Sequence, residues 1–247
     1  MPAEPGRPGS STLEAAAQIA VETCLGLRPG EEVLVVADSQ RPRTVPEALI
    51  AAATGAGADA VLAVFTARER SPSEPPASVT EAMCRADAAI LYTSASLSHS
   101  QARNLAQEAR TRIISAPGLS EDGFVRTLSV DVPRLADLTV RLADAVTNSR
   151  SVSLRTPAGT DMRMELAHPV TAADGICRMS GHLDFFPPGL ILSVPVAGSA
   201  TGAAVVEEPS PTSAGSRPPS PWSFATAGRW PFAGGRRRTG FAGCSKT

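Results

Sequence analysis

Short apolar runs alternate with helical patterns along the N-terminal part of the chain. The runs EEVLVVAD, DAVLAVF, DAAILYTS and TRIISAP are each bounded by charged or turn-forming residues. A short, continuously apolar run is typical of a strand that is buried on both faces of a sheet. The segments between them, such as TVPEALIAAATGAGA and SHSQARNLAQEAR, have the spacing of amphipathic helices. Strands that alternate with helices predict an α/β fold, in which helices cover both faces of a parallel sheet.

The limits of this α/β domain come from its first and last helices. Ser11 stands three residues before Glu14, the spacing of a capping box, and an Ala-rich helical pattern follows as far as Gly26. The residues before it are polar and rich in Pro and Gly, so we expect a disordered leader over 1–10. A long amphipathic pattern, SVDVPRLADLTVRLADAVTNS, closes the unit. The α/β domain is therefore predicted over 11–149.

A β-rich pattern begins after that helix. The segment SVSLRTPAGTDMRMEL alternates apolar and polar residues on both sides of the turn PAGT, which predicts a β-hairpin with one buried face. The segment GLILSVPVAGSATGAAVVEE continues the β character. A few strands without further sheet or covering helices are only marginally stable. We therefore predict a truncated, incomplete β-rich second domain over 150–208.

The C-terminal tail has a different composition. From Pro209 to Thr247 there is no Val, Ile, Leu, Met, Asp or Glu. Such a segment cannot bury an aliphatic core, so we predict a disordered tail over 209–247. Two origins stay open: a shift of the reading frame, or a genuine basic tail that binds a partner. Back-translation with GC-rich codons, read in a shifted frame, gives apolar residues that alternate around an Asp-Gly turn, which favours the frameshift.

Composition and charge narrow the classes of partner. The chain has 247 residues, 43% of them hydrophobic, and a formal net charge of -1 at pH 7, which are ordinary values for a soluble globular protein. The charge gives no reason to expect nucleic acid or an anionic membrane as a partner. We find no signal peptide and no apolar stretch long enough for a membrane helix. The cysteines form no Cys-x-x-Cys pair, so we expect free thiols and a cytoplasmic location.

The glycines do not form a nucleotide-binding motif. Gly55, Gly57 and Ala60 fit the spacing G-x-G-x-x-A, but they end a helical pattern and precede a strand. In a dinucleotide site the motif follows a strand and opens a helix, so that the helix N-terminus faces the pyrophosphate. A helix C-terminal turn explains these glycines better.

Two histidine-containing motifs are the candidates for chemistry. Ser98 and His99, in SASLSHSQAR, follow the carboxyl end of a predicted strand, where open α/β sheets bind ligands. We predict that both contact the substrate and that His99 is catalytic; the structural alternative is a polar first turn of a helix. His182 and Asp184, in GHLDFFPPG, point the same way on an extended chain and could bind a metal. A metal site needs three or four ligands, however, and no further His or Cys cluster lies nearby.

Five segments, taken in order, resemble one family of enzymes. They are LRPGEEVLVVAD, EALIAAATGAGADAVLAVF, ADAAILYTSASLSHSQAR, RTPAGTDMRMEL and GLILSVPVAGSATGAAVVEE. Over residues 11 to about 208 they resemble the aminopeptidase T family of metallo-aminopeptidases and its relatives, the 2,5-dihydroxypyridine ring-opening dioxygenases. The resemblance implies an N-terminal α/β domain, a C-terminal metal-binding domain, a homodimer and a divalent zinc, cobalt or iron ion. It implies hydrolysis of a small peptide in one branch and iron-dependent cleavage of a small aromatic ring in the other.

The sequence departs from the aminopeptidase pattern at two acidic positions. In PPGLILSVPVAGSATG, Leu190 stands where that branch has a metal-ligating glutamate, and Ala197 replaces a second acid. The further metal ligands of the family lie in a C-terminal portion that this chain lacks. Because most of the metal ligands are absent, we expect this chain to be inactive and to bind few metal ions or none. We place metal-dependent aminopeptidase-type hydrolysis first, the ring-cleaving dioxygenase second and a non-catalytic or partner-binding remnant third.

Overall fold

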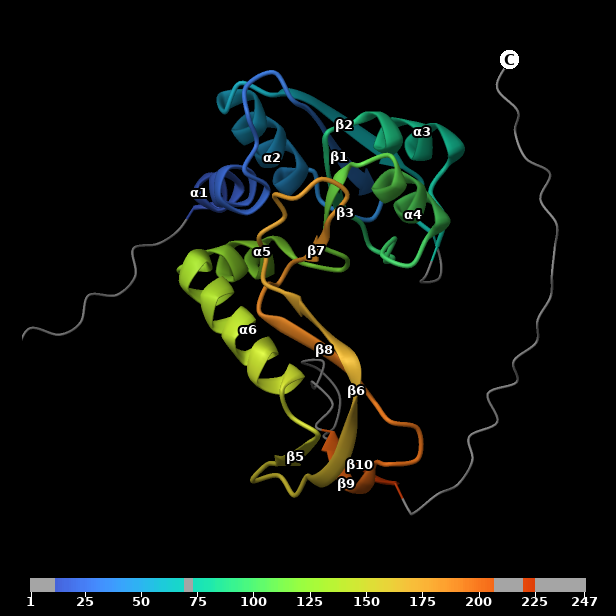
Figure 1. The fold of residues 1–247 in the computed structure, drawn as a ribbon. Coiled ribbons are helices and arrows are strands. Elements are labelled where there is room, and N and C mark those ends of the chain that lie inside the picture. The colour runs from blue at the N-terminus through green and yellow to red at the C-terminus, as the bar shows by residue number, and fades with distance from the viewer. Residues whose placement is uncertain (1–11, 69–72, 207–219, 225–247) are drawn as a thin grey trace, which may run out of the picture. The chain divides into compact units, whose positions relative to one another are not determined.

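The computed structural model of this protein is shown as a ribbon in Figure 1, and it describes residues 12–68, 73–206 and 220–224. By contacts within the chain, the protein divides into two compact units. Of the described residues, unit 1 comprises 12–68, 73–148 and 168–193. Unit 2 comprises 149–167, 194–206 and 220–224. The predicted leader over 1–10 lies outside the described residues.

Unit 1 is built on a parallel sheet of five strands. The strands run in the order β2-β1-β3-β4-β7, and each neighbouring pair is parallel. Their bounds are β1 (Glu32–Asp38), β2 (Asp59–Phe65), β3 (Ala88–Tyr92), β4 (Arg112–Ser115) and β7 (Leu183–Phe185). The predicted α/β class, with a parallel sheet, is confirmed.

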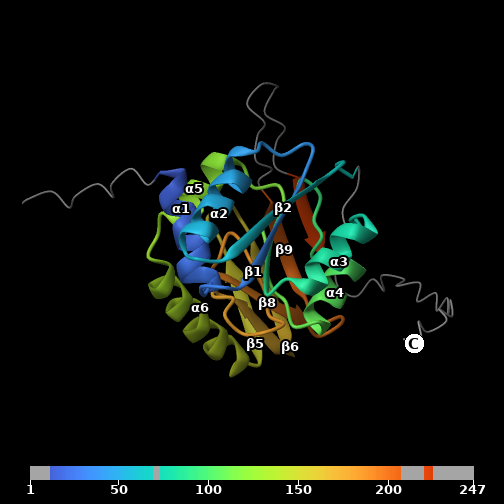
Figure 2. The ribbon, with the colours of Figure 1, turned by 90° about the horizontal axis from the view of Figure 1, so that it is seen from above.

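Helices cover both faces of this sheet, as Figure 2 shows from above. One face carries the helices α1 (Leu13–Gln18), its π-type continuation η1 (Ile19–Leu25), α2 (Thr44–Gly55) and α5 (Glu121–Leu128). The long helix α6 (Val132–Thr147) joins this core with its first residue, Val132. The other face carries α3 (Ala77–Arg85) and α4 (Gln101–Glu108). The first helical segment ends at Gly26, which has a φ of 57°, as its glycine predicts. Helix α2 ends at Gly55, and Gly57, with a φ of 82°, makes the left-handed turn two residues before β2 begins.

The continuous apolar runs are explained by the two cores that lie on the two faces. Along β1, Val33 and Val35 point into the core under α1 and α2. Their neighbours Leu34 and Val36 point into the core under α3 and α4. Successive side chains of a strand point to opposite faces, so a strand covered on both faces must be apolar at every position.

Strand β7 is the part of unit 1 that the sequence pattern did not predict. Residues 168–193 return to the α/β unit, so the expected second domain over 150–208 is interrupted. Ile113 donates its N–H to the carbonyl of His182, and Cys177 is fully buried in the core of the first face. The reason is the free edge of β4, which offers backbone groups that a later segment can pair with.

Unit 2 contains a small antiparallel sheet. The chain order of its strands is β5 (Ser151–Arg155), β6 (Asp161–Ala173), β8 (Leu190–Pro195), β9 (Thr201–Val206) and β10 (Ser220–Phe224). The sheet order is β10-β9-β6-β5, with β8 paired to β6, and β6 and β8 include residues of both units. The predicted hairpin is β5–β6, in which Arg155 faces Asp161 across the PAGT turn.

One segment of the predicted tail is part of this sheet. Ser220–Phe224 forms β10 and pairs antiparallel with β9, with Trp222 opposite Ala204. No strand was predicted here, because the tail has no aliphatic side chain larger than alanine to bury, whereas strand pairing needs only backbone groups. Of the predicted disordered tail over 209–247, the other residues lie outside the described part of the chain.

The described cysteines and helices match two expectations from the sequence: free thiols and no membrane-spanning helix. The described cysteines, Cys24, Cys84 and Cys177, are free thiols. Burial raises the pKa values of Cys24 and Cys177 to about 12, so both are core groups rather than nucleophiles. No helix within the described ranges is both long and apolar enough to span a membrane.

The two-sided burial of the sheet is tested by truncating a central strand. Ile90 of β3 is 1% exposed and lies in the core of the first face. Ile90→Ala is expected to lower the free energy of unfolding by about 2–5 kcal/mol, because it leaves a cavity. Leu142→Ala, at a position on α6 that is 52% exposed, should cost below about 1 kcal/mol. Urea denaturation measures both; equal losses would contradict the two-core arrangement.

Candidate functional site

The carboxyl edge of the parallel sheet carries polar residues at the ends of its central strands. The last residues of β1, β3 and β4 are Asp38, Tyr92 and Ser115. In the sheet order β2-β1-β3, the strand that follows β1 in the chain, β2, lies on one side of β1, and the next strand, β3, lies on the other side. Open α/β sheets bind ligands at such a switch point, outside the carboxyl ends of the strands. This edge is therefore the candidate ligand site of unit 1.

Asp38 fastens the loop after β3 to the end of β1. Its Oδ2 accepts hydrogen bonds from the N–H and the hydroxyl of Ser94, both at 2.6 Å, and its Oδ1 accepts one from the Gln40 N–H at 3.0 Å. The side chain is almost fully buried. A buried carboxylate is tolerated when donors satisfy it, and here two of the three donor groups belong to Ser94 in the loop after β3.

Arg41 and Tyr92 place a cation and a phenol beside Asp38. The guanidinium lies over the Tyr92 ring, 4.6 Å from its centroid, and Nη2 donates to the Tyr92 hydroxyl at 2.9 Å. It also donates to the carbonyl of Leu119. Burial raises the pKa of Tyr92, so the phenol keeps its proton beside the cation. The edge thus combines a positive charge with an aromatic face.

Of the predicted substrate contacts, His99 is exposed and Ser98 is buried. The Ser98 hydroxyl lies 2.8 Å from that of Ser115 and accepts a hydrogen bond from Ser96 at 3.0 Å. His99 is exposed and stands directly before Ser100, which caps α4 by accepting the Arg103 N–H at 3.1 Å. The loop therefore uses Ser98 for its own hydrogen bonds and leaves the imidazole of His99 at the sheet edge.

The second predicted motif forms an ion pair at the outer strand β7. His182 Nε2 lies 3.6 Å from Oδ2 of Asp184, as their spacing on an extended chain predicts. Asp184 is fully buried; its Oδ1 accepts the Phe185 N–H at 2.6 Å, and its Oδ2 accepts the Gly175 N–H at 3.1 Å. The Asp184 carboxylate raises the pKa of His182, against the opposing effect of burial. Burial raises the pKa of the neighbouring Asp174, and the charge of Asp184 adds to that shift.

These residues do not fit a metal ion. Both oxygens of Asp184 already accept backbone N–H groups, and Asp174 uses Oδ1 for the Ile176 N–H at 2.8 Å. Across the part of the chain that the structure describes, no group of three or more His, Cys, Asp or Glu could hold an ion. Leu190, the first residue of β8, offers no ligand atom either. No chemical step is therefore assigned to a metal at His182 and Asp184.

Sequence reasoning missed Asp38, Arg41 and Asp174. Asp38 ends the run EEVLVVAD, where its charge was taken only as the boundary of a strand. The signal that could have found it is its place: an acid at the carboxyl end of a central parallel strand lies on the ligand-binding edge. Arg41 gave no such signal, because its partner Tyr92 is distant in sequence. Asp174 gave none either, because its neighbour Asp184 lies on β7, which the sequence pattern did not predict.

Comparison with known proteins identifies the family of this chain. A family profile described as NicX, 2,5-dihydroxypyridine 5,6-dioxygenase, matches residues 13–210. The chain therefore belongs to this family, whose members are metal-dependent enzymes. A search of curated proteins gives no match.

Two solved structures share its fold. The 2,5-dihydroxypyridine dioxygenase from Pseudomonas putida KT2440 has a TM-score of 0.64 and 18% identity, over 81% of this chain and 60% of that chain. Wild-type AmpT from Thermus thermophilus has a TM-score of 0.52 and 18% identity, over 79% of this chain and 64% of that chain. This chain spans less than two thirds of either protein, and identities this low establish the fold alone. The resemblance found in the sequence is confirmed, and the family match favours the branch that was placed second.

The role of Asp38 in holding the loop is testable by Asp38→Asn. An amide has a single acceptor oxygen, so part of the hydrogen bonding to Ser94 and Gln40 is lost, at a cost of about 1–3 kcal/mol. Hydrogen exchange at Ser94 and along the loop to Ser98 should become faster. The matched control is Asp137→Asn on α6, whose ion pair with Arg141 is exposed and worth about 1 kcal/mol or less. Unchanged exchange in the loop would refute this role.

The ion pair of His182 predicts a pH dependence of stability. Because folding raises its pKa, the stabilisation is fully present below the unfolded-state value of about 6.5 and is lost as the pH rises through the folded value. Wild type should therefore lose stability relative to His182→Gln across that window, as measured by urea denaturation at a series of pH values. The control is His99→Gln, at an exposed position. A difference between wild type and His182→Gln that does not change with pH would contradict the ion pair.

Proposed function

We propose that this protein acts on a small hydroxylated nitrogen heteroaromatic, in the ring-opening reaction of a 2,5-dihydroxypyridine 5,6-dioxygenase. The observation that carries the proposal is the family match over residues 13–210. The leucine at position 190 supports it, since a leucine cannot supply the metal ligand that the resemblance to the aminopeptidase branch requires there.

The carboxyl edge of unit 1 is proposed as the face that meets the substrate. Its exposed imidazole, His99, stands on a loop that Asp38 and Ser98 hold through hydrogen bonds. The hydroxyl groups of a dihydroxypyridine are proton donors of the kind that an imidazole can accept from. Removal of a hydroxyl proton raises the electron density of the ring and so favours its attack by oxygen. In this proposal His99 is the general base, and Asp38 and Ser98 are positioning residues.

The proposal assigns no step to a metal. The family is metal-dependent, but Asp184 and Asp174 use carboxylate oxygens within the fold, and His182 is paired with Asp184. Metal content is therefore part of the test rather than part of the mechanism. Protein loaded with Fe(II) and then desalted gives the number of bound ions per chain by elemental analysis.

The activity is tested by oxygen uptake with 2,5-dihydroxypyridine in the presence of Fe(II). We expect uptake matched by loss of the ring absorbance, and His99→Ala should lower the rate by about 10²- to 10⁴-fold, the usual contribution of a general base. Its melting temperature should stay close to that of wild type, since the side chain is exposed. His168→Ala, at the other exposed histidine, is the matched control and should keep the wild-type rate.

Each alternative function gives a different result. Hydrolysis of Leu-p-nitroanilide without oxygen uptake would place the protein with the aminopeptidases. No turnover and no bound metal would make it a non-catalytic remnant. A loss of melting temperature in His99→Ala as large as its loss of rate would return His99 to a structural role.

A further inference from the structure

The two edges of the parallel sheet differ in their protection. On one edge, β7 has only three residues, and a very short edge strand offers little to pair with. On the other edge, β2 has seven residues, and all of them pair with β1 in an unbroken register from Glu32–Asp59 to Asp38–Phe65. Among the strands that the structure describes, none pairs with the outer side of β2, which is therefore a long edge without a bulge.

Strand β2 also lacks the side chains that usually block edge pairing. After Asp59 its sequence is AVLAVF, with no charged residue and no proline. Val61 is 56% exposed and Val64 is 36% exposed. Proteins commonly protect edges with Lys, Pro or bulges, and a long apolar edge without them is a pairing surface.

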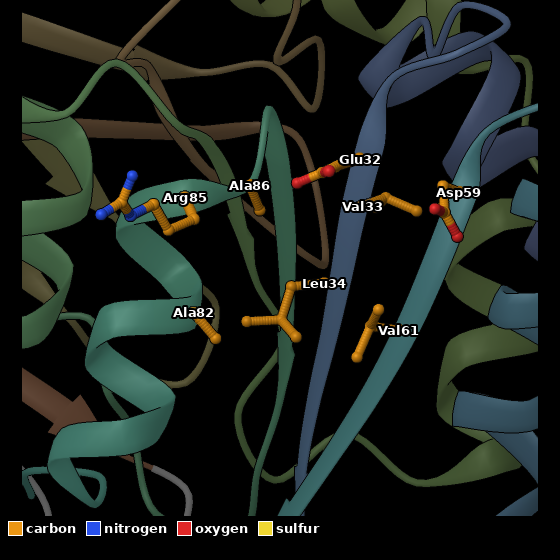
Figure 3. A pocket seen from close by; sticks show the side chains of 8 residues that line it. All are labelled: Glu32, Val33, Leu34, Asp59, Val61, Ala82, Arg85 and Ala86. Carbon is orange, nitrogen blue, oxygen red and sulfur yellow. The ribbon is translucent and has the colours of Figure 1, made fainter.

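A shallow apolar groove of about 200 Å³ borders this edge. Figure 3 shows Leu34 on β1 and Val61 on β2 as its strand-side wall, with Ala82 of α3 on the helix side. Three charged residues also line the groove: Glu32 on β1, Asp59 on β2 and Arg85 at the end of α3. The groove lies at the amino ends of the strands, away from the edge that binds ligands in such sheets, so we do not assign it to the substrate.

Two copies of β2 that run antiparallel would place large side chains opposite small ones. Around Leu62 the sequence runs Ala-Val-Leu-Ala-Val. In an antiparallel pair of two such strands centred on Leu62, each valine faces an alanine: Val61 faces Ala63, and Val64 faces Ala60. The exposed valines thus meet the smallest apolar side chains, which allows close packing on both faces.

The two ends of β2 carry opposite charges, which two antiparallel copies of the strand would bring together. Asp59 begins the strand, and Arg68 follows its end, with the guanidinium 5.8 Å from the ring centroid of Phe65. Neither side chain forms an ion pair with any residue that the structure describes. In the same antiparallel register Asp59 faces Phe65 of the second strand, and hence Arg68 beside it.

We propose that β2 is the surface through which this protein pairs with a second copy of itself, antiparallel and centred on Leu62. The two five-stranded sheets then form one continuous sheet, and the two-fold axis passes through its plane at Leu62. Such an interface is isologous: the same residues are used by both copies, and each Asp59 meets Arg68 of the other. The proposal does not depend on the proposed enzymatic function.

Sedimentation equilibrium of the full chain tests the pairing. We expect wild type to have twice the mass of one chain, and Val61→Lys to raise the dissociation constant by about tenfold or more, because it places two charges in the interface. Val61 is more than half exposed in one copy, so the fold should persist, as circular dichroism checks. Leu142→Lys, at the exposed apolar position on α6, is the control and should leave the mass unchanged.

A charge reversal tests the register. Asp59→Arg alone and Arg68→Asp alone each bring like charges together and should weaken the dimer, whereas the double variant should restore it. A monomeric wild type would overturn the proposal. So would a dimer that resists Val61→Lys, a dimer that Leu142→Lys dissociates, or a double variant no stronger than the single ones.

Discussion

Burial of the central strands on both faces is the constraint on which the rest of unit 1 depends. Along β1, Val33 and Val35 point into one core, and Leu34 and Val36 point into the other. A strand enclosed in this way has no freedom to shift, because a slip of one residue would exchange the two faces. The carboxyl ends of β1, β3 and β4 are therefore held at fixed positions, and the polar residues that follow them gather at one edge.

The candidate site is a consequence of this scaffold. Asp38, at the end of β1, accepts two hydrogen bonds from Ser94, which follows β3. Ser98, in the same loop, is hydrogen-bonded to Ser115 at the end of β4. Three strands thus fix one loop, which presents His99 to solvent. Enzymes commonly place reactive groups on loops that a rigid scaffold positions, as the sheet does here for His99. It gives the proposed ring-opening chemistry a physical location in unit 1.

Much of the fold was predictable because its signals are local. The apolar runs of β1 and β3 and the helix-ending glycines are properties of a few neighbouring residues. The pairing of His182 with Asp184 followed from their spacing. Strand β7 was not predictable, since a three-residue strand has no pattern and its position depends on the free edge of β4. Asp38 was missed because its role arises from Ser94, which is distant in sequence.

The most direct test of the account is to locate the substrate on the protein. Amide chemical-shift changes on addition of 2,5-dihydroxypyridine, recorded without oxygen, report binding apart from turnover. The account predicts changes that concentrate in Asp38–Arg41 and in the loop from Thr93 to Ser100, and that weaken in His99→Ala. Changes confined to the groove beside α3 or to unit 2, or no changes at all, would contradict the assignment of the carboxyl edge as the substrate-binding face.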